Sequence, residues 1–279
     1  KLKVLFEDAH KMGLSFELPD VNRSNYRFEP VTDTVIRYGL GAIKGTGESA
    51  IAAITEARKE GGAFTSLFDF CNRVGRANLN KRTVEALIKA GAFDSIDMNR
   101  AALIASIDLA FEYAVTQAAN ANQGGLFDML DGPGSSTQEP ALVNTLPWGI
   151  KQRLTEEKTA VGFFLSGHLF DEGVHEIRKF VRTRIDDLVD SRDSVLLAGI
   201  VSDFRVINGR SGRLALFKLD DKTASIDASA DEKLWGAQAQ LLKDDALIIV
   251  QGTPRFDRFS GGMRLNINQI WDLPMARCR

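Results

Sequence analysis

The hydrophobic pattern of this chain changes its period once, close to residue 195, and this change limits the folds that the chain can adopt. Upstream, apolar residues recur at helical spacing, and residues 99–119 place Leu103, Ile107 and Phe111 on one face of a predicted helix. Downstream, apolar and polar residues alternate, and glycine-rich turns separate the alternating runs. We therefore predict a multi-domain α+β protein, in which an all-α part is followed by a β part.

The β part has the element order of a small barrel. The predicted strands are residues 195–204, 213–219, 225–231, 246–251 and 263–271, and a helix is predicted over residues 231–242. Five strands with a helix before the fourth strand is the order of an OB-fold. We therefore expect a five-stranded OB-fold barrel.

Composition and charge exclude several classes of protein. The 279 residues suffice for two or three small domains. No run approaches the roughly 18 apolar residues of a membrane span, and no signal peptide opens the chain, so we expect a cytoplasmic protein without membrane contact. The chain begins at Lys1 within a predicted helix, and we expect a fragment. Because the net charge is −2, any contact with nucleic acid must come from local cations and backbone N–H groups.

The strongest local pattern is a glycine-flanked turn after Leu40. Glycines at 45 and 47 allow a tight turn between two helices, and apolar residues at 43, 50 and 54 are placed to pack those helices together. The first N–H groups of the second helix are free to bind phosphate. We expect the turn to contact the DNA backbone rather than the bases. The residues expected to do so are Ile43, Lys44, Gly45, Thr46 and Gly47.

A second, weaker hairpin follows at Ala90-Gly91-Ala92-Phe93. It has cations nearby, at Lys81, Arg82 and Lys89, and paired hairpins make a grip for a duplex backbone. Its glycine pair is incomplete. It either contacts duplex DNA or only braces the first hairpin, and the sequence favours neither.

A polar segment over residues 121–147 contains an apolar island. Leu126 and Phe127 follow Gln123 at a spacing that suits a peptide docking into a hydrophobic pocket of a partner, because an exposed apolar pair in a loop needs a reason. The alternative is that both side chains fold back onto the core of the chain. Residue types alone leave the two interpretations equal.

The second and third barrel strands carry candidates for single-stranded DNA, since aromatic rings stack on bases and arginines meet phosphates. These candidates are Phe204, Arg205, Arg210, Arg213, Phe217 and Lys218. Four nearby carboxylates, at 203, 220, 221 and 227, dilute the positive charge. A barrel that serves only as a structural joint is the open alternative.

No pattern for catalysis or metal binding is present in the sequence. The three histidines lack metal-ligand spacing, and Cys71 and Cys278 form no CxxC pair. Adjacent carboxylates such as Asp220-Asp221 point to opposite faces of a strand and converge poorly on a metal. We therefore expect no catalytic residue and no cofactor, and a structural role for His168.

Five stretches resemble the C-terminal half of the bacterial DNA polymerase III alpha subunit. They are residues 12–22, 38–45, 87–94, 162–168 and 259–262, in order along nearly the whole chain. Two departures are Leu169, where the family usually has proline, and residues 225–231, where it usually has an apolar run. The family's clamp motif, Gln-x-x-Leu/Met-Phe, matches Gln123, Leu126 and Phe127 and favours docking over burial of this pair.

The resemblance implies a domain plan and a role. The plan is the end of a fingers domain at 1–34, a tandem helix-hairpin-helix clamp-binding domain at 35–120, a loop with the clamp motif at 121–147, a helical connector at 148–191, the OB-fold at 192–274 and a tail at 275–279. It implies partners in duplex DNA, the beta sliding clamp and other polymerase III holoenzyme subunits. The nucleotidyltransferase site and its Mg²⁺ belong to an upstream domain. The alternative function is a piece of a DNA repair or ligation protein.

Overall fold

The computed structural model describes residues 2–127, 138–209, 212–258 and 261–277. The chain divides into two compact units, Lys1–Ser166 and Gly167–Arg279, and each is described by itself. Within the described ranges, no helix combines the length and the apolar character that crossing a membrane would require.

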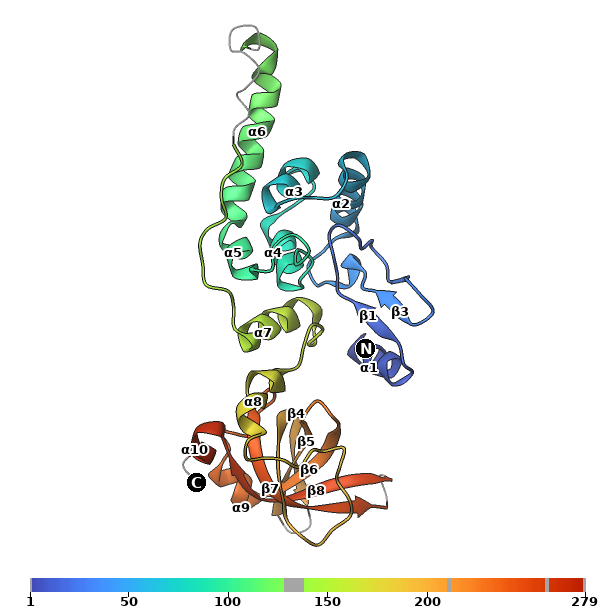
Figure 1. Ribbon diagram of the computed structural model, residues 1–279, viewed down its shortest axis with the longest axis vertical. Helices are drawn as coiled ribbons and strands as arrows, with labels where there is room; N and C mark the ends of the chain where they lie inside the picture. Colours follow the sequence, from blue (N-terminus) through green and yellow to red (C-terminus); the bar gives the residue numbers. More distant parts are fainter. Residues whose placement is uncertain (1, 128–137, 210–211, 259–260, 278–279) are drawn as a thin grey trace. The chain divides into compact units, whose positions relative to one another are not determined.

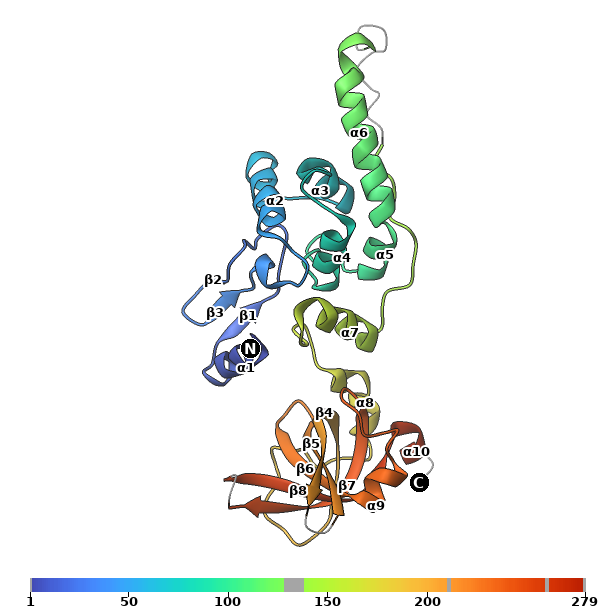
Figure 2. The ribbon, with the colours of Figure 1, turned by 180° about the vertical axis from the view of Figure 1, so that it is seen from behind.

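The first unit opens with a helix and a small sheet. Helix α1 (Leu2–Lys11) is followed by strands β1 (Ser15–Glu17), β2 (Glu29–Pro30) and β3 (Val35–Arg37). Strand β3 lies in the middle, parallel to β1 and antiparallel to β2 (Figures 1 and 2). Aromatic rings join these elements, with centroids 4.4 Å apart for Phe6 and Phe16 and 4.7 Å apart for Phe28 and Tyr38. This sheet was not expected from the sequence.

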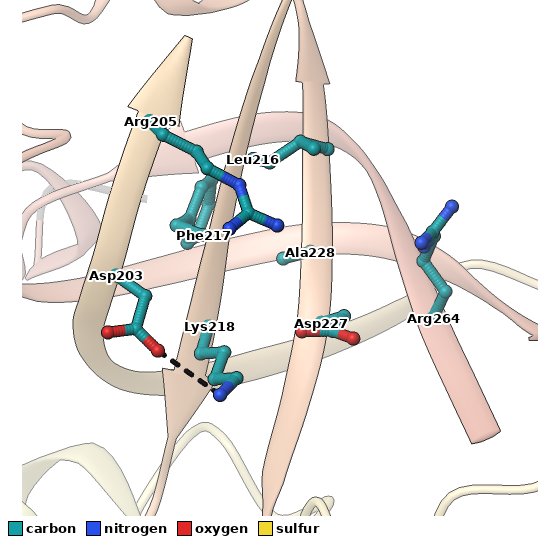
Figure 3. Close-up of a pocket in the computed structure, with 8 residues that line it drawn as sticks. All are labelled: Asp203, Arg205, Leu216, Phe217, Lys218, Asp227, Ala228 and Arg264. Carbon is teal, nitrogen blue, oxygen red and sulfur yellow. Dashed lines mark ion pairs between the residues drawn. The ribbon is translucent and has the colours of Figure 1, made fainter. Parts of the chain in front are cut away.

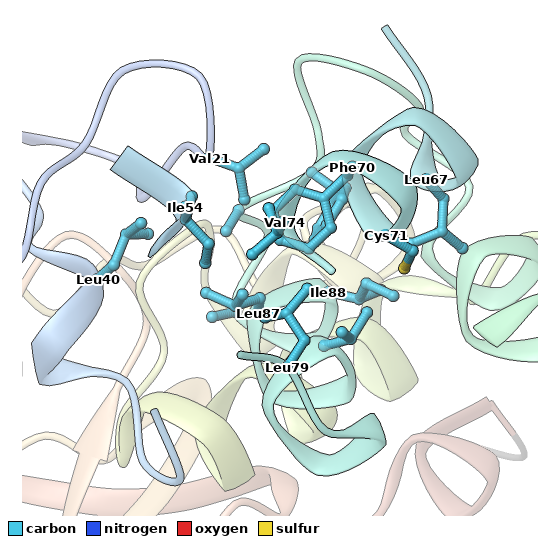
Figure 4. Close-up of a cluster of buried hydrophobic side chains, with 14 of the residues drawn as sticks. Val21, Leu40, Ile54, Leu67, Phe70, Cys71, Val74, Leu79, Leu87 and Ile88 are labelled. Carbon is cyan, nitrogen blue, oxygen red and sulfur yellow. The ribbon is translucent and has the colours of Figure 1, made fainter. Parts of the chain in front are cut away.

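Short helices form the rest of the first unit. They are the 3-10 turn η1 (Leu40–Ala42) and helices α2 (Glu48–Gly61), α3 (Leu67–Val74), α4 (Lys81–Lys89), α5 (Arg100–Ala105), α6 (Ile107–Phe127) and α7 (Ile150–Val161). Ser66, Asn80 and Asn99 begin α3, α4 and α5, because each side chain accepts a hydrogen bond from the backbone N–H three residues later. The helices enclose an apolar core that includes Leu40, Ile54, Phe70, Leu87 and Ile88 (Figure 4).

The prediction of one continuous helix over residues 99–119 is wrong. Two helices replace it, and they meet at Ser106, which is fully buried. The Ser106 hydroxyl donates to the carbonyl of Ala102 and accepts from the N–H of Val143, at 2.8 Å in each case. The interruption therefore ties the returning chain to the helices, which helical periodicity alone does not reveal.

The loop predicted to begin at residue 121 also starts later than expected. Helix α6, the long green helix in Figure 1, continues to Phe127. The backbone of Gln123, Leu126 and Phe127 is therefore helical, while their side chains lie outside the described residues. The prediction of a loop over the clamp motif is wrong for these residues.

The second unit is a closed barrel with short helices around it. The 3-10 turn η2 (Leu169–Glu172) and helix α8 (Val174–Ile177) come first, followed by β4 (Val195–Gly209), β5 (Gly212–Asp220), β6 (Ser225–Asp231), α9 (Glu232–Ala237), β7 (Leu247–Asp257), β8 (Gly262–Trp271) and α10 (Leu273–Arg277). The strand order around the barrel is β4-β5-β6-β8-β7. The predicted fold class, a helical hairpin region followed by a five-stranded OB-fold, is confirmed.

Strand β6 forms although its sequence suggested a weak strand. Its residues Ile226, Ala228 and Ala230 are buried, so the small side chains face the barrel interior. Ala228 pairs with Phe217 on β5 and with Leu265 on β8. An alanine between two large residues fits a tightly packed interior, and this explains why no apolar run is needed here.

Other boundaries in the second unit differ from the predictions. Helix α9 ends at Ala237 rather than at residue 242, and β4 continues to Gly209 through an irregularity between Ser202 and Arg205. Asp203, at this irregularity, has a positive φ of 55°. The predicted helical connector contains no regular helix after Ile177 in this unit.

Candidate nucleic-acid interface

The predicted hairpin turn lies between η1 and α2. Gly45 has a φ of 85°, a conformation that favours glycine. The Thr46 hydroxyl closes the turn, because its Oγ1 lies 2.9 Å from the carbonyl oxygen of Leu40 and 2.7 Å from that of Ile43. The first helix of the expected hairpin is only a single 3-10 turn, Leu40–Ala42, which corrects the expectation of two full helices.

The beginning of α2 faces solvent without a side-chain cap. Gly47 is the N-cap residue, with φ −93° and ψ 153°, and as a glycine it has no side chain to accept from the first turn. Gly47, Glu48 and Ser49 are exposed. The N–H groups of this turn have no partner within the helix, and the helix dipole adds partial positive charge. This end of α2 therefore has the chemistry of an anion site, although the Glu48 carboxylate also occupies its first turn.

Helix α4 brings two further predicted residues to the turn. The buried Thr83 donates from Oγ1 to the Gly45 carbonyl, at 3.3 Å. The first turn of α4, which carries the exposed Lys81 and Arg82, therefore lies against the hairpin turn. Lys81 forms an ion pair with Asp108, and both side chains are mostly exposed. The exposed pair leaves Lys81 accessible to a phosphate, because such surface pairs are weak.

Three predicted residues have other roles in this structure. Ile43 is 2% exposed and packs in the core. Lys89 is held by Glu85 at 2.8 Å and by Glu156 at 2.9 Å, and the hydrogen bond with Glu85 is the main cause that raises its pKa. Lys44 is exposed, but its Nζ lies 3.4 Å from the carbonyl oxygen of Thr159 at the end of α7.

The second hairpin turn is filled by a side chain of the protein itself. Gly91 has a φ of 85°, as in the first turn, but Arg100 lies against it with 2% exposure. The Arg100 guanidinium binds Asp94 through two hydrogen bonds, at 2.8 and 2.6 Å, and donates to the Lys89 carbonyl at 3.1 Å. Arg100 thus fills the space beside Gly91, and these contacts favour a bracing role for this hairpin.

The brace extends to α7. Glu157 is fully buried and lies 3.3 Å from Arg100. Its other oxygen accepts from the N–H groups of Leu165 and Ser166, the latter at 2.8 Å. Burial lowers the pKa of Arg100, but its hydrogen bonds and charge interactions with Asp94 and Glu157 outweigh this and raise the pKa overall. The arginine therefore stays charged at the centre of the brace.

The barrel carries a hollow on the outer face of β4, β5, β6 and β8 (Figure 3). Lys218 on β5 pairs in register with Asp227 on β6, which pairs with Arg264 on β8. Asp203 lies 3.1 Å from Lys218, so positive and negative side chains alternate across the face. Arg205 extends from β4 toward β5 in Figure 3. Cations at 205, 218 and 264 outnumber carboxylates at 203 and 227 in this hollow.

Of the two aromatic candidates for stacking on bases, Phe217 is not accessible to a base. Phe217 is 3% exposed and points into the barrel, because it shares the inward alternation of Ala215 and Leu219. Phe204 is partly buried against the barrel core. Arg213 is exposed, and Arg210 lies outside the described residues. Phe217 was misassigned because a period of two does not say which face of a strand is the inner one.

Two family models match this chain. One is described as a helix-hairpin-helix motif and matches residues 13–103. The other is described as an OB-fold nucleic acid binding domain and matches residues 195–273. Both coincide with the units in which the hairpin turn and the barrel hollow lie.

Known relatives match along the whole chain. The DNA polymerase III subunit alpha of Neisseria meningitidis serogroup B is 44% identical over 281 residues, which cover 100% of this chain and 24% of that protein. The chain thus matches a segment of the DNA polymerase III alpha subunit along its whole length. The alpha subunit of Pseudomonas aeruginosa is 39% identical and covers 99% of this chain and 25% of its own length. The chain thus spans about a quarter of the length of these alpha subunits.

A solved structure is similar to this chain at a low level. A small single-stranded DNA-binding protein from Streptomyces coelicolor covers 30% of this chain and 96% of its own chain, with 17% identity and a TM-score of 0.27. A similarity this low does not bear on the function of the chain.

His168 of this alpha-subunit segment has a local structural role. Its Nδ1 accepts from the N–H of Phe170 at 3.1 Å and caps η2, while its Nε2 lies 3.2 Å from Asp220. Over the described ranges, no three His, Cys, Asp or Glu residues gather as a metal site would require.

Sequence reasoning missed two groups on the barrel of this alpha-subunit segment. Phe256 on β7 is 52% exposed and pairs with Met263 on β8. Arg264 lines the hollow and lies 3.3 Å from Asp257. The sequence signal that could have found them is the aromatic and basic residues on the fourth and fifth strands of the barrel.

Proposed function

We propose that this chain is a non-catalytic part of a bacterial replicative DNA polymerase that holds DNA behind the active site and connects the enzyme to its sliding clamp. The observation that carries the proposal is the uncapped start of α2, exposed beside the first turn of α4. The match to alpha subunits along the whole of this chain supports it. In this proposal the protein works in the cytoplasm, with other holoenzyme subunits as partners.

Duplex DNA is held by its phosphates. The N–H groups after Thr46 bind one phosphate, while Lys81 and Arg82 on the neighbouring helix approach the same backbone. Such contacts carry no sequence information, which suits an enzyme that copies every sequence. Each phosphate neutralised adds a slope of about −0.9 to the dependence of log K on log salt, so the small number of cations predicts a modest salt dependence.

The clamp contact is assigned to Gln123, Leu126 and Phe127. Burying Leu126 and Phe127 in a partner's pocket contributes about 1.5–3 kcal/mol for each side chain. A contact this short has only about micromolar affinity alone. Because the hairpin turn holds the same DNA that the ring encircles, the effective concentration of the motif rises. The weak contact is therefore sufficient to connect the polymerase to the clamp.

Single-stranded DNA is assigned to the barrel, through Arg205 and Lys218 in the hollow and the exposed Arg213 on β5. The polymerisation chemistry and its Mg²⁺ are assigned to other parts of the full-length enzyme. This segment raises processivity because it slows the dissociation of the polymerase from DNA.

A titration of the chain with duplex DNA, a single strand and the beta clamp tests the proposal. Leu126→Ala with Phe127→Ala removes the side chains that enter the pocket, so we expect clamp binding to be lost and duplex affinity to stay unchanged. Fluorescence anisotropy with labelled DNA and labelled clamp measures both. Wild-type chain that fails to bind duplex at any salt concentration would refute the DNA-holding function, and unaffected clamp binding by the double variant would refute the motif.

A further inference from the structure

A basic segment precedes the barrel and takes no part in the functions proposed above. Residues 178–184 contain Arg178, Lys179, Arg182, Arg184 and the aromatic Phe180, without any carboxylate. We refer to residues 178–184 as the basic strap. It follows α8 in the yellow part of Figure 1.

The backbone of the strap presents its cations outward. Residues 181–184 belong to neither helix nor strand. Val181 is 0% exposed and Ile185 is 6% exposed and packs with the barrel core, whereas Arg182 and Arg184 are exposed. Burial therefore alternates along residues 181–185, since Thr183 is also less exposed than its two neighbours. Alternation therefore places the two guanidinium groups in a row on the solvent side.

The strap is fixed to the turn that joins β5 and β6. The Arg178 guanidinium lies 2.8 Å from Asp221, which is 1% exposed, and donates to the Thr183 carbonyl at 3.1 Å. The N–H of Ile185 donates to the same Asp221 carboxylate at 3.2 Å. Strands β5 and β6 carry Lys218 and Asp227 of the hollow, so the strap begins at one end of that face. A strap that is already ordered loses little entropy on binding a ligand.

Three cations of the strap are available to a ligand. Arg178 is neutralised by Asp221, and Arg184 makes a surface ion pair with Asp186 at 3.4 Å, which contributes little. In the described part of the chain, no carboxylate lies within salt-bridge distance of Lys179 or Arg182. Glu176, whose carboxylate feels the charge of Lys179, is bound by Arg277.

We propose that the basic strap is a binding site for single-stranded nucleic acid that continues the barrel hollow beyond the turn between β5 and β6. Lys179, Arg182 and Arg184 contact successive phosphates. Phe180, which is 38% exposed, stacks on a base. The strap takes a single strand because an unpaired base offers its face to a ring, whereas a duplex keeps its bases stacked inside. The proposal rests on the assignment of single-stranded DNA to the barrel.

The test compares two double variants. The strap variant carries Lys179→Gln and Arg182→Gln. The charge-matched control in the same unit carries Lys233→Gln and Lys243→Gln, at two lysines that are also exposed. The probes are fluorescein-labelled oligothymidine and a labelled duplex, titrated with the 279-residue chain over a salt series. We expect the strap variant to raise the single-strand Kd on the order of tenfold and to reduce the salt slope by about 1.4, because two phosphate contacts are lost. The duplex Kd of the strap variant stays unchanged. The control variant keeps the wild-type Kd for both probes.

Phe180→Leu separates stacking from charge. It raises the single-strand Kd at high salt, where electrostatic contacts are screened, and leaves the salt slope unchanged. Thermal unfolding of each variant confirms that the barrel is intact, since the replaced side chains are exposed.

Three results would overturn the inference. They are equal single-strand affinities for the strap variant and the control, an equal loss for duplex and single strand, and a wild-type chain that binds duplex but no single strand. The last result leaves the hairpin assignment intact, whereas a chain that binds neither probe refutes the proposed function as well.

Discussion

Single buried charges set the geometry of this molecule more than its surface charges do. Asp221 is 1% exposed and holds the strap to the barrel through Arg178, the N–H of Ile185 and the Thr223 hydroxyl. Arg100 performs a similar task in the first unit, where it joins the second hairpin to Glu157. A buried ion pair costs free energy to desolvate, but the loss of one partner leaves an uncompensated charge. Each of these residues is therefore a point of local fragility.

Asp221→Asn gives a pH-dependent prediction. Burial raises the pKa of the Asp221 carboxyl, but hydrogen bonds from Thr223, Arg178 and Ile185 outweigh it and lower the pKa overall. A carboxylate with a lowered folded-state pKa contributes stability above its unfolded pKa and loses it as the pH falls through the folded value. We expect the variant to lose about 3–5 kcal/mol of unfolding free energy at neutral pH, and the difference from wild type to shrink as the pH falls below about 4.

Urea unfolding at a series of pH values measures this difference, with the exposed Asp187→Asn as the control. A difference that stayed constant down to the lowest pH would show that folding does not lower the pKa of Asp221.

At the scale of elements, the outer face of β5, β6 and β8 is a row of alternating charges. Asp227 sits in register between Lys218 and Arg264, so its carboxylate competes with any phosphate for both cations. The face therefore binds a single strand less tightly than its cations alone would allow.

Asp227→Asn removes this competition. We expect it to tighten single-strand binding several-fold and to steepen the salt slope by about 0.7, as one more phosphate contact becomes effective. Anisotropy titration with oligothymidine measures the change, and Glu60→Gln, an exposed change of the same charge in the first unit, is the control. If the two variants bind equally, the hollow does not contact the strand.

At the scale of the whole molecule, the sequence predicted what depends on local pattern. The glycine turn at Gly45 and the order of strands and helix along the barrel sequence follow from residues close together in sequence, and both are found in the structure. The role of the second hairpin was not predictable, because Arg100 meets a glutamate 57 residues away. The inward orientation of Phe217 depends on barrel closure, which alternation alone does not specify.

The DNA site itself stays a prediction at several positions. The Gly45 carbonyl accepts a hydrogen bond from Thr83 in the first turn of α4, and Gly47 begins α2, so this turn lies against α4. The domain boundaries and the clamp motif remain predictions too, since the side chains of that motif lie outside the described residues.

The central claim is that the open N–H groups at the start of α2 bind a DNA phosphate, and Gly47→Asp tests it most directly. Asp is a favoured N-cap, so the new carboxylate occupies those N–H groups while helix stability is kept. Gly149→Asp is the matched control, because Gly149 is likewise an uncapped glycine N-cap, on α7. In both positions a Cβ meets no close atom.

The measurement is the duplex Kd of the two variants at low salt. The account predicts that Gly47→Asp raises the Kd about tenfold, which corresponds to roughly 1.4 kcal/mol, with no loss of thermal stability, and that Gly149→Asp leaves the Kd unchanged. Equal duplex affinities for both variants and the wild-type chain would contradict the account.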